Sequence, residues 1–443
     1  MPDLPRQIRL AAGDYFMHGQ DRRMRRAGML GNVCRVALRL EAGLDVNLLR
    51  ERVTASPILD WLARVRITRP LLALSPVWRK AEQPRTFFFE HPVQEAGGDG
   101  PGMLPQVVAG RDLHACEGAL ALDLVRRKDG TAQFVLSWNH ALMDARGAEL
   151  ILRHLSLDGA AKGTPTIENL INPEQRGWSL SKWWRKLALA RGSLKWLRES
   201  GREPLFTLLP SPRPADGCRN PCRLLSFSEE ETARINERCQ RLNAGFRRSH
   251  FYLAASLRSL HTVAVRRGNE TGAYLIPVPH DMRRRGASGP IFSNHLSILF
   301  YRIEPRQAAR LSDIISELTR QMMEQIRDRF PESCMAALDM FKPIPLDYYV
   351  RHLGQPTRGK FASLCFSDSG ETCAGISEMF GARIREVTHW VPTWRPPGLT
   401  VLFWSFSGRL RTLLSWVDDC LNPEEVDSLE EGLRSALLDE EVA

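Results

Sequence analysis

The residues best suited to chemistry lie in the stretch Asn139-His140-Ala141-Leu142-Met143-Asp144. A neutral imidazole that faces a cavity can take a proton from an attacking hydroxyl or amine, which is the work of a general base. The bare spacing His-x-x-x-Asp is weak evidence, because it occurs a second time from His154 to Asp158. The residues alone therefore leave two interpretations of His140 open, a general base and a structural histidine.

The segments around His140 predict a fixed position for its ring. Residues 119–125 and 132–138 alternate apolar and polar side chains on either side of Lys128-Asp129-Gly130-Thr131, which is typical of a β-hairpin. Downstream, Ala148, Ile151 and Leu155 recur at helical spacing. His140 is therefore expected where a strand ends, just before a helix. The second copy is expected at the far end of that helix, with Asp158 in the following turn.

Further segments predict an α+β chain in two large parts. A strand over 34–40, a helix capped by Asp45, and short strands over 63–67 and 86–90 form, with the hairpin and its helix, a unit of about 160 residues. The second part repeats this mixture. We expect a helix capped by Ser228, helices over 250–265 and 311–330, a helix from Asn422, and strands over 273–278, 292–300, 361–370, 399–406 and 409–417. We expect domains at 1–160 and 226–443, joined by residues 161–225.

The joining segment has an unusual composition. Four tryptophans are interleaved with Lys and Arg, and Gly192 interrupts the pattern. Such a helix suits a membrane interface, or it packs on the protein with its basic face in water; both interpretations stay open. The tryptophans are Trp178, Trp183, Trp184 and Trp196. Prolines at 204, 210, 212, 214 and 221 then predict a linker.

Composition restricts the class of protein. The chain has 443 residues with 43% hydrophobic and 25% charged side chains, and no apolar run near 18 residues, so we expect a globular protein without a membrane span. Of its nine cysteines only Cys218 and Cys222 lie close together, and one such pair does not predict a zinc site. We expect reduced thiols, no metal and a cytoplasmic location. The membrane interpretation of residues 178–196, which stays open, would add peripheral contact at the inner membrane surface.

The formal net charge of +10 favours an anionic partner. Nucleic acid, anionic lipid and a phosphorylated or acidic partner all fit this charge. No helix-turn-helix, zinc-finger or RNA-binding sheet signature is present, so we do not expect nucleic acid.

The motif around His140 resembles a known signature. Asn139-His140-x-x-x-Asp144-Ala145-x-Gly147, between a hairpin and a helix, is similar to the His-His-x-x-x-Asp-Gly signature of the chloramphenicol-acetyltransferase-like superfamily. That superfamily includes condensation domains, wax ester synthase/diacylglycerol acyltransferases and polyketide-associated acyltransferases. The sequence departs from it at Asn139 and Ala145. The resemblance implies an α+β fold of two lobes, each like a chloramphenicol acetyltransferase monomer, that meet in a V around a tunnel with His140 midway along it.

Three later stretches resemble the superfamily in the expected order. Residues 279–285 are similar to its Pro-Val-Asp-x-Arg stretch, which implies a buried ion pair between Asp144 and Arg283. Residues 292–300 resemble the Gly-Asn-x-x-Ser strand beside the tunnel, with Ser293 in place of Gly. Residues 361–370 resemble its Ser-Asn-x-Gly strand end, with Asp368 in place of Asn. The tunnel candidates are then Asn294, Ser297 and Ser367, and His295 is a strand residue of unknown facing.

The resemblance also implies a reaction. An acyl group would pass from a thioester of coenzyme A or of an acyl carrier protein's phosphopantetheine to a hydroxyl or amine acceptor, with His140 as general base and no bound cofactor. The alternative is a non-catalytic module of the same fold that binds acyl carrier protein or lipid. The retained His140, Asp144 and Arg283 argue against this alternative, because a binding module needs none of them.

Overall fold

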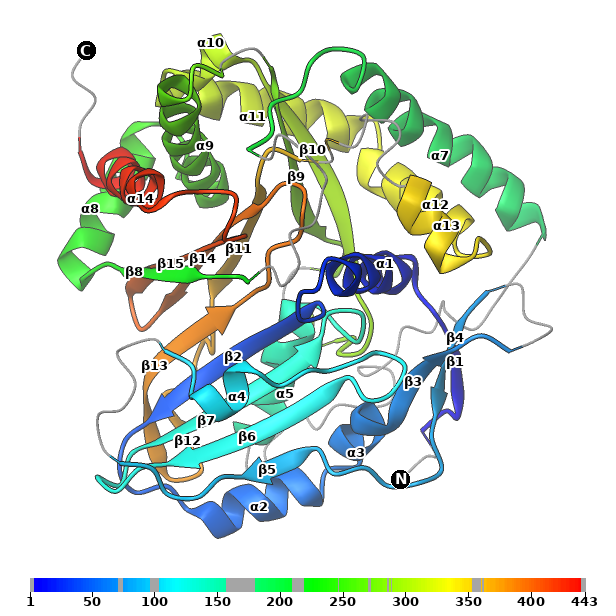
Figure 1. The fold of residues 1–443 in the computed structure, drawn as a ribbon, viewed down its shortest axis with the longest axis vertical. Helices are drawn as coiled ribbons and strands as arrows, with labels where there is room; N and C mark the ends of the chain where they lie inside the picture. The colour runs from blue at the N-terminus through cyan, green and yellow to red at the C-terminus, as the bar shows by residue number, and fades with distance from the viewer. Residues whose placement is uncertain are drawn as a thin grey trace.

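The computed structural model describes residues 4–70, 75–95, 103–156, 180–208, 219–245, 247–269, 272–284, 287, 289–352, 360 and 362–439. The fold is a mixture of helices and sheets in two lobes, which lie one above the other in Figure 1. The lower lobe is built on a six-stranded sheet in the order β12-β13-β2-β7-β6-β5. Its strands are β2 (Val33–Leu40), β5 (Phe88–Glu90), β6 (Leu120–Arg126), β7 (Ala132–Asn139), β12 (Glu378–Met379) and β13 (Ala382–Trp390).

The hairpin and helix expected around His140 are confirmed. β6 and β7 pair antiparallel from Leu120 opposite Trp138 to Arg126 opposite Ala132. Helix α5 (Ala145–Ser156) follows, and its expected face, which includes Ala148 and Ile151, is buried. His140 and the four residues after it therefore form a short connection between a central strand and a buried helix.

The other local elements of the first part mostly follow the sequence. Helix α2 (Val46–Thr54) is capped by the side chain of Asp45, which accepts a hydrogen bond from the Leu48 amide. The expected strand over 63–67 starts later, because Ser56 caps a helix that runs through residue 64. The remaining elements are α1 (Ala12–Arg26), α3 (Pro57–Arg64), α4 (Gln106–Ala109) and the sheet β1 (Gln7–Arg9), β4 (Val77–Lys80) and β3 (Val65–Thr68).

The upper lobe is built on a four-stranded sheet in the order β11-β14-β15-β8 and a separate β9–β10 pair. Helices α9 and α14 pack around a core that includes Phe251, Phe403 and Leu429. The strands are β8 (Cys222–Ser226), β9 (Tyr274–Asp281), β10 (Leu296–Ile303), β11 (Cys365–Glu371), β14 (Leu399–Phe406) and β15 (Arg409–Trp416). The helices are α8 (Glu229–Arg241), α9 (Arg248–Arg266), α10 (Pro305–Ala308), α11 (Leu311–Arg327), α12 (Phe330–Phe341), α13 (Leu346–His352) and α14 (Pro423–Leu438).

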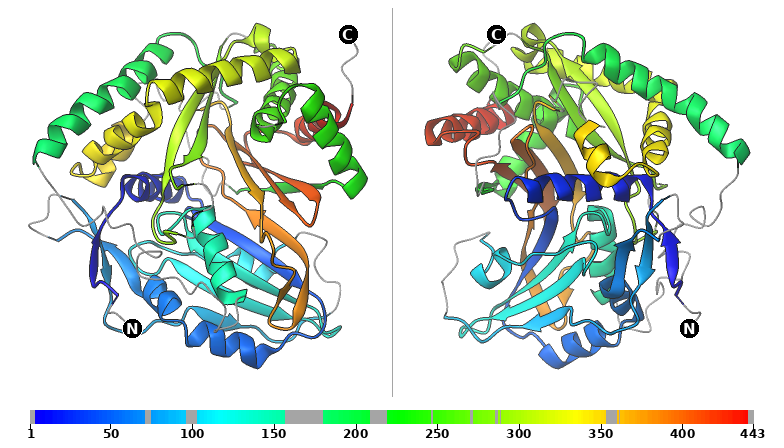
Figure 2. Two further views of the ribbon diagram at one scale, coloured as in Figure 1. Left: turned by 180° about the vertical axis from the view of Figure 1, so that it is seen from behind. Right: turned by 45° about the vertical axis from the view of Figure 1, so that its right-hand side comes forward.

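The two lobes exchange chain segments, so the expected boundaries need a correction. Strand β13, which falls in the expected domain 226–443, pairs antiparallel with β2 in the lower sheet. In return, Met24 of α1 belongs to the core of the upper lobe. A strand edge left open would present unpaired backbone groups, and β13 covers that edge of β2. Helix α1 lies between the two lobes (Figures 1 and 2).

The Trp-rich segment forms helix α7 (Leu180–Ser200), which runs along the outside of the upper lobe (Figure 2). Gly192 interrupts the sequence pattern but not the helix, which continues through it and lies against α12. There Ser333 Oγ accepts a hydrogen bond from the Ser193 amide at 2.8 Å. Trp196 packs inward on Phe330, with ring centroids 5.6 Å apart.

The outer side of α7 differs from this inner side. Trp184 is 62% exposed, whereas Trp178 and the side chain of Trp183 lie outside the described residues. The membrane contact of this segment stays a prediction. Among the helices that the structure describes, none has the length and apolar character needed to cross a bilayer.

Candidate active site

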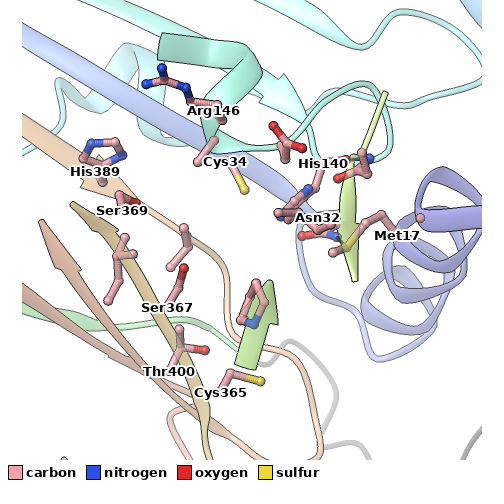
Figure 3. A pocket seen from close by; sticks show the side chains of 18 of the residues that line it. Met17, Asn32, Cys34, His140, Arg146, Cys365, Ser367, Ser369, His389 and Thr400 are labelled. Atoms are coloured by element: carbon pink, nitrogen blue, oxygen red, sulfur yellow. Dashed lines mark hydrogen bonds between the residues drawn. The ribbon is translucent and has the colours of Figure 1, made fainter. Parts of the chain in front are cut away.

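A cavity of about 510 Å³ lies between the two lobes. Figure 3 shows side chains from both lobes around it, with His140 on one side and Ser367 and Thr400 on the other. Of the predicted site residues, His140, Asp144, Asn294, Ser297 and Ser367 line the cavity. Its apolar wall includes Phe16, Met17, Leu296, Ile298, Leu338, Val391 and Leu402. A mainly apolar cavity with a few polar groups is the usual form of a small-molecule site.

The backbone of His140 is tied to the strand beside it. Its amide donates to the carbonyl oxygen of Asn32 at 2.8 Å, which holds the residue where β7 ends next to the start of β2. Burial lowers the pKa of the imidazole, and the nearby backbone carbonyls and the Asp144 carboxylate oppose this effect only in part. Nδ1 is buried without a hydrogen-bond partner among the described residues. The ring is therefore neutral near pH 7, as a general base must be.

Asp144 and Arg283 form a buried ion pair. Two parallel hydrogen bonds of 2.9 and 3.0 Å join the guanidinium to the two carboxylate oxygens. The side chains of Arg283 and Asp144 are only 3% and 1% exposed. The guanidinium also donates to the carbonyl oxygen of Pro290 at 3.0 and 3.1 Å. Residues 139 positions apart in the sequence are thus locked together, and the connection after β7 is fixed to the upper lobe.

The carboxylate of Asp144 also organises the backbone around it. It accepts hydrogen bonds from the amides of Gly147 and His295, both at 2.9 Å. Gly147 lies so close to the neighbouring chain that an added Cβ would collide with the carbonyl oxygen of Ile291. Ala145, which replaces the glycine of the motif, begins helix α5, where an ordinary side chain is accommodated. Asp144 therefore fixes the shape of the site, and Gly147 allows the close approach.

Asn139, which replaces the first histidine of the motif, is fully buried behind the cavity wall. Its Nδ2 donates to Asp21 Oδ1 and to the carbonyl oxygen of Leu113, both at 2.9 Å, and its Oδ1 accepts from the Ala141 amide at 3.1 Å. Each end of the amide is thus satisfied by protein groups. The residue anchors the start of the motif to α1.

Asn294 lies next to His140, and hydrogen bonds to His140 and to Asp14 of α1 hold it there. Its Nδ2 donates to the carbonyl oxygen of His140 at 2.8 Å, and its backbone amide donates to Asp14 Oδ1 at 2.7 Å. Asp14 is fully buried; burial raises its pKa, and hydrogen bonds from Asn294, Trp78 and Ser293 oppose this. The expected strand over 292–300 is partly wrong, because β10 starts only at Leu296.

The reason for the late start of β10 lies at Ser293. This residue adopts φ of 76°, the left-handed region that glycine would occupy without strain. Its amide donates to the Leu142 carbonyl and its hydroxyl to Asp14, both at 2.9 Å. These bonds hold a serine in the conformation for which the resemblance expected glycine.

The remaining predicted residues differ in their surroundings. Ser297 lines the cavity, but its hydroxyl donates to the Pro331 carbonyl at 2.6 Å. Ser367 lines the wall opposite His140. His295 is outside the cavity wall, and its Nε2 lies 2.9 Å from the Phe292 carbonyl oxygen. His154, of the second His-x-x-x-Asp copy, lies 3.1 Å from Ser56 Oγ and likewise does not line the cavity.

Four functional candidates on the cavity or beside it were not predicted. Asn32, Glu149 and His389 line the cavity, and Asp14 supports Asn294. Burial raises the pKa of Glu149 to about 7 and lowers that of His389 to about 4. Only Asp14 had a signal in the sequence, an aspartate before two aromatic residues. The others lie in ordinary helical or strand positions, and only the assembled lobes bring them together.

No protein-family model matches the sequence, and no curated protein matches it either. Many solved structures are similar in fold. One is the trichothecene 15-O-acetyltransferase from Fusarium sporotrichioides, at 13% identity and TM-score 0.66, covering 98% of this chain and 96% of that one. Another is the condensation domain of the Monacolin K polyketide synthase, at 12% identity and TM-score 0.65, covering 97% and 96%.

A third similar structure also covers nearly the whole chain. It is the wax ester synthase/diacylglycerol acyltransferase from Marinobacter aquaeolei VT8, at 15% identity and TM-score 0.58, covering 97% of this chain and 98% of that one. All three similarities span both lobes. The chain therefore has the two-lobed fold of these two acyltransferases and of this condensation domain.

Proposed function

We propose that the protein is an acyltransferase that moves an acyl group from a thioester to a hydroxyl or amine. The observation that carries the proposal is the neutral, half-buried imidazole of His140 on the wall of a cavity between the two lobes. The Asp144–Arg283 pair, which fixes the connection that holds His140, supports it. The fold shared with acyltransferases and condensation domains supports acyl transfer in general.

In the proposed reaction His140 acts as general base. The acceptor's oxygen or nitrogen attacks the thioester carbonyl carbon while the imidazole takes its proton. The carbonyl oxygen carries the negative charge of the tetrahedral intermediate until the carbon–sulfur bond breaks. The thiolate then leaves and receives a proton from the imidazolium, which returns His140 to its neutral form. No acyl-enzyme and no bound cofactor are needed.

The donor in this proposal is an acyl-CoA or an acyl carrier protein. The apolar side chains of the cavity wall suit an acyl chain, and the net charge of +10 suits the phosphates of coenzyme A or an acidic carrier protein. Positioning of the two substrates in one cavity would supply much of the rate, since it converts an encounter of two molecules into a reaction within one complex.

The test is the release of free thiol from a panel of acyl-CoAs and acylated carrier proteins, with a pool of alcohols and amines as acceptors. We expect acceptor-dependent release in the wild type and a decrease of roughly 10²- to 10⁴-fold in His140→Ala. His154→Ala is the matched control, because it alters the second His-x-x-x-Asp copy outside the cavity. Equal activity of wild type and folded His140→Ala would contradict the role of His140, and absence of release with every donor would favour the binding module.

A further inference from the structure

Asn32 lies beside His140 in a position that its backbone fixes. It comes directly before β2, is fully buried and lines the cavity. Its amide donates to Asp21 Oδ1 at 2.8 Å, and its carbonyl oxygen accepts from the His140 amide at 2.8 Å. Figure 3 shows the side chains of Asn32 and His140 next to each other on the cavity wall. The side chains of Asn32 and His140 therefore line the same cavity.

The side-chain amide of Asn32 makes almost no use of its hydrogen-bonding capacity. Its Nδ2 has a weak contact with the thioether sulfur of Met17 at 3.8 Å, and Oδ1 has no partner among the described residues. Asn139, equally buried, makes three hydrogen bonds with its amide. A buried amide without partners costs free energy, so its retention in a folded protein calls for an explanation. One explanation is a ligand that accepts a hydrogen bond from Nδ2, the donor end of the amide, which has only the weak contact with sulfur.

The chemistry of the proposed reaction indicates which ligand atom this is. The acceptor's proton goes to His140, so the group that still needs a partner is the thioester carbonyl oxygen, on which negative charge develops. It requires a hydrogen-bond donor. Two other donors close to His140 are engaged, since Asn294 Nδ2 bonds to the His140 carbonyl and the Arg283 guanidinium bonds to Asp144. The Asn32 Nδ2, by contrast, has only its weak contact with sulfur.

We propose that Asn32 is a catalytic residue whose Nδ2 donates a hydrogen bond to the carbonyl oxygen of the acyl thioester. This proposal rests on the proposed acyl transfer and adds a residue to it. The hydrogen bond strengthens as the oxygen gains charge, so it stabilises the transition state more than the bound substrate. No covalent bond to Asn32 forms, and the backbone bonds of the residue stay in place throughout.

The test compares Asn32→Leu with wild type in the thiol-release assay and in thermal unfolding. We expect kcat to fall by about 10²- to 10³-fold with KM little changed, because the lost bond matters most in the transition state. We expect the melting temperature to stay the same or rise, because leucine has a similar size and removes a buried polar group without partners. Asn139→Leu is the matched control and should lower the melting temperature, because it leaves Asp21 and the Leu113 carbonyl without that donor.

Two results would overturn this inference. One is an Asn32→Leu protein that keeps wild-type kcat while His140→Ala is inactive, which would leave the acyl-transfer proposal intact. The other is a drop in melting temperature as large as that of Asn139→Leu, which would make Asn32 a structural residue whatever its activity. A wild type that transfers no acyl group from any donor would instead remove both proposals.

Discussion

Asp144 and His140 lie four residues apart on one connection, yet their side chains are in opposite states. The carboxylate of Asp144 accepts hydrogen bonds from Arg283 and from two backbone amides. The Nδ1 atom of His140 and the Oδ1 atom of Asn32 are buried without a partner among the described residues. We call Asn139, Asp144 and Arg283 the frame, and His140 and Asn32 the reactive wall.

This difference in hydrogen bonding shows how the site combines stability with reactivity. A buried polar group with all its hydrogen bonds made holds the chain in one conformation. A buried polar group without them lowers stability, but it is ready to bond to a substrate without first breaking a bond to the protein. Substitutions in the frame should therefore act mainly on folding, and substitutions in the reactive wall mainly on catalysis.

The largest effect on stability is expected from breaking the frame at its ion pair. Asp144→Ala leaves the buried guanidinium of Arg283 without its main partner and should lower the free energy of unfolding by about 3–5 kcal/mol. Urea unfolding followed by circular dichroism would measure the change. A loss well under about 1 kcal/mol, the range of a surface ion pair, would show that the frame does not hold the fold together.

The matched control for this prediction is the exposed pair of Arg50 and Glu90. It has similar geometry, with hydrogen bonds of 2.7 and 3.0 Å, but Arg50 is 49% exposed. Water and salt weaken such a pair, so Arg50→Ala should change the free energy of unfolding far less than Asp144→Ala. Equal effects from both substitutions would remove burial as the reason for the difference.

A smaller effect is expected at Gly147, whose amide donates a hydrogen bond to Asp144 of the frame. Gly147→Ala places a Cβ against the Ile291 carbonyl oxygen, so the backbone must shift, at a cost of about 1–3 kcal/mol. The same unfolding experiment measures it. Gly110→Ala is the control, because its Cβ meets no atom within 4 Å. If Gly147→Ala is as stable as wild type, the segments around Gly147 and Ile291 can move apart without lowering the free energy of unfolding.

The smallest expected effect concerns the pH dependence of activity, which is set by the pKa of His140 in the reactive wall. The base must be neutral, and burial lowers the pKa of His140 below the ordinary value of 6.5. Activity should therefore be lost only as the pH falls below 6.5, when the imidazole becomes protonated. The acid limb of kcat/KM against pH measures this. An acid limb centred at or above that ordinary value would contradict His140 as a base with a lowered pKa.

Much of the local structure was determined by the sequence itself. The alternation over 119–125 and 132–138 predicts the hairpin, because successive side chains of a strand point to opposite faces of the sheet. Asp45, Ser228 and Asn422 cap their helices through hydrogen bonds to residues three positions away. Such interactions are short in sequence, so composition and spacing are enough to predict them. The Asp144–Arg283 pair was expected only through the resemblance.

The tertiary structure decided which polar groups belong to the frame and which to the reactive wall. The bond from Ser293 to Asp14 spans 279 positions, and strand β13 reaches β2 from the other end of the chain. Nothing in the residues around Asn32 sets it apart from Asn139, although one amide is satisfied and the other is not. Hydrogen-bond satisfaction depends on neighbours in space, and those neighbours exist only after the two lobes have come together.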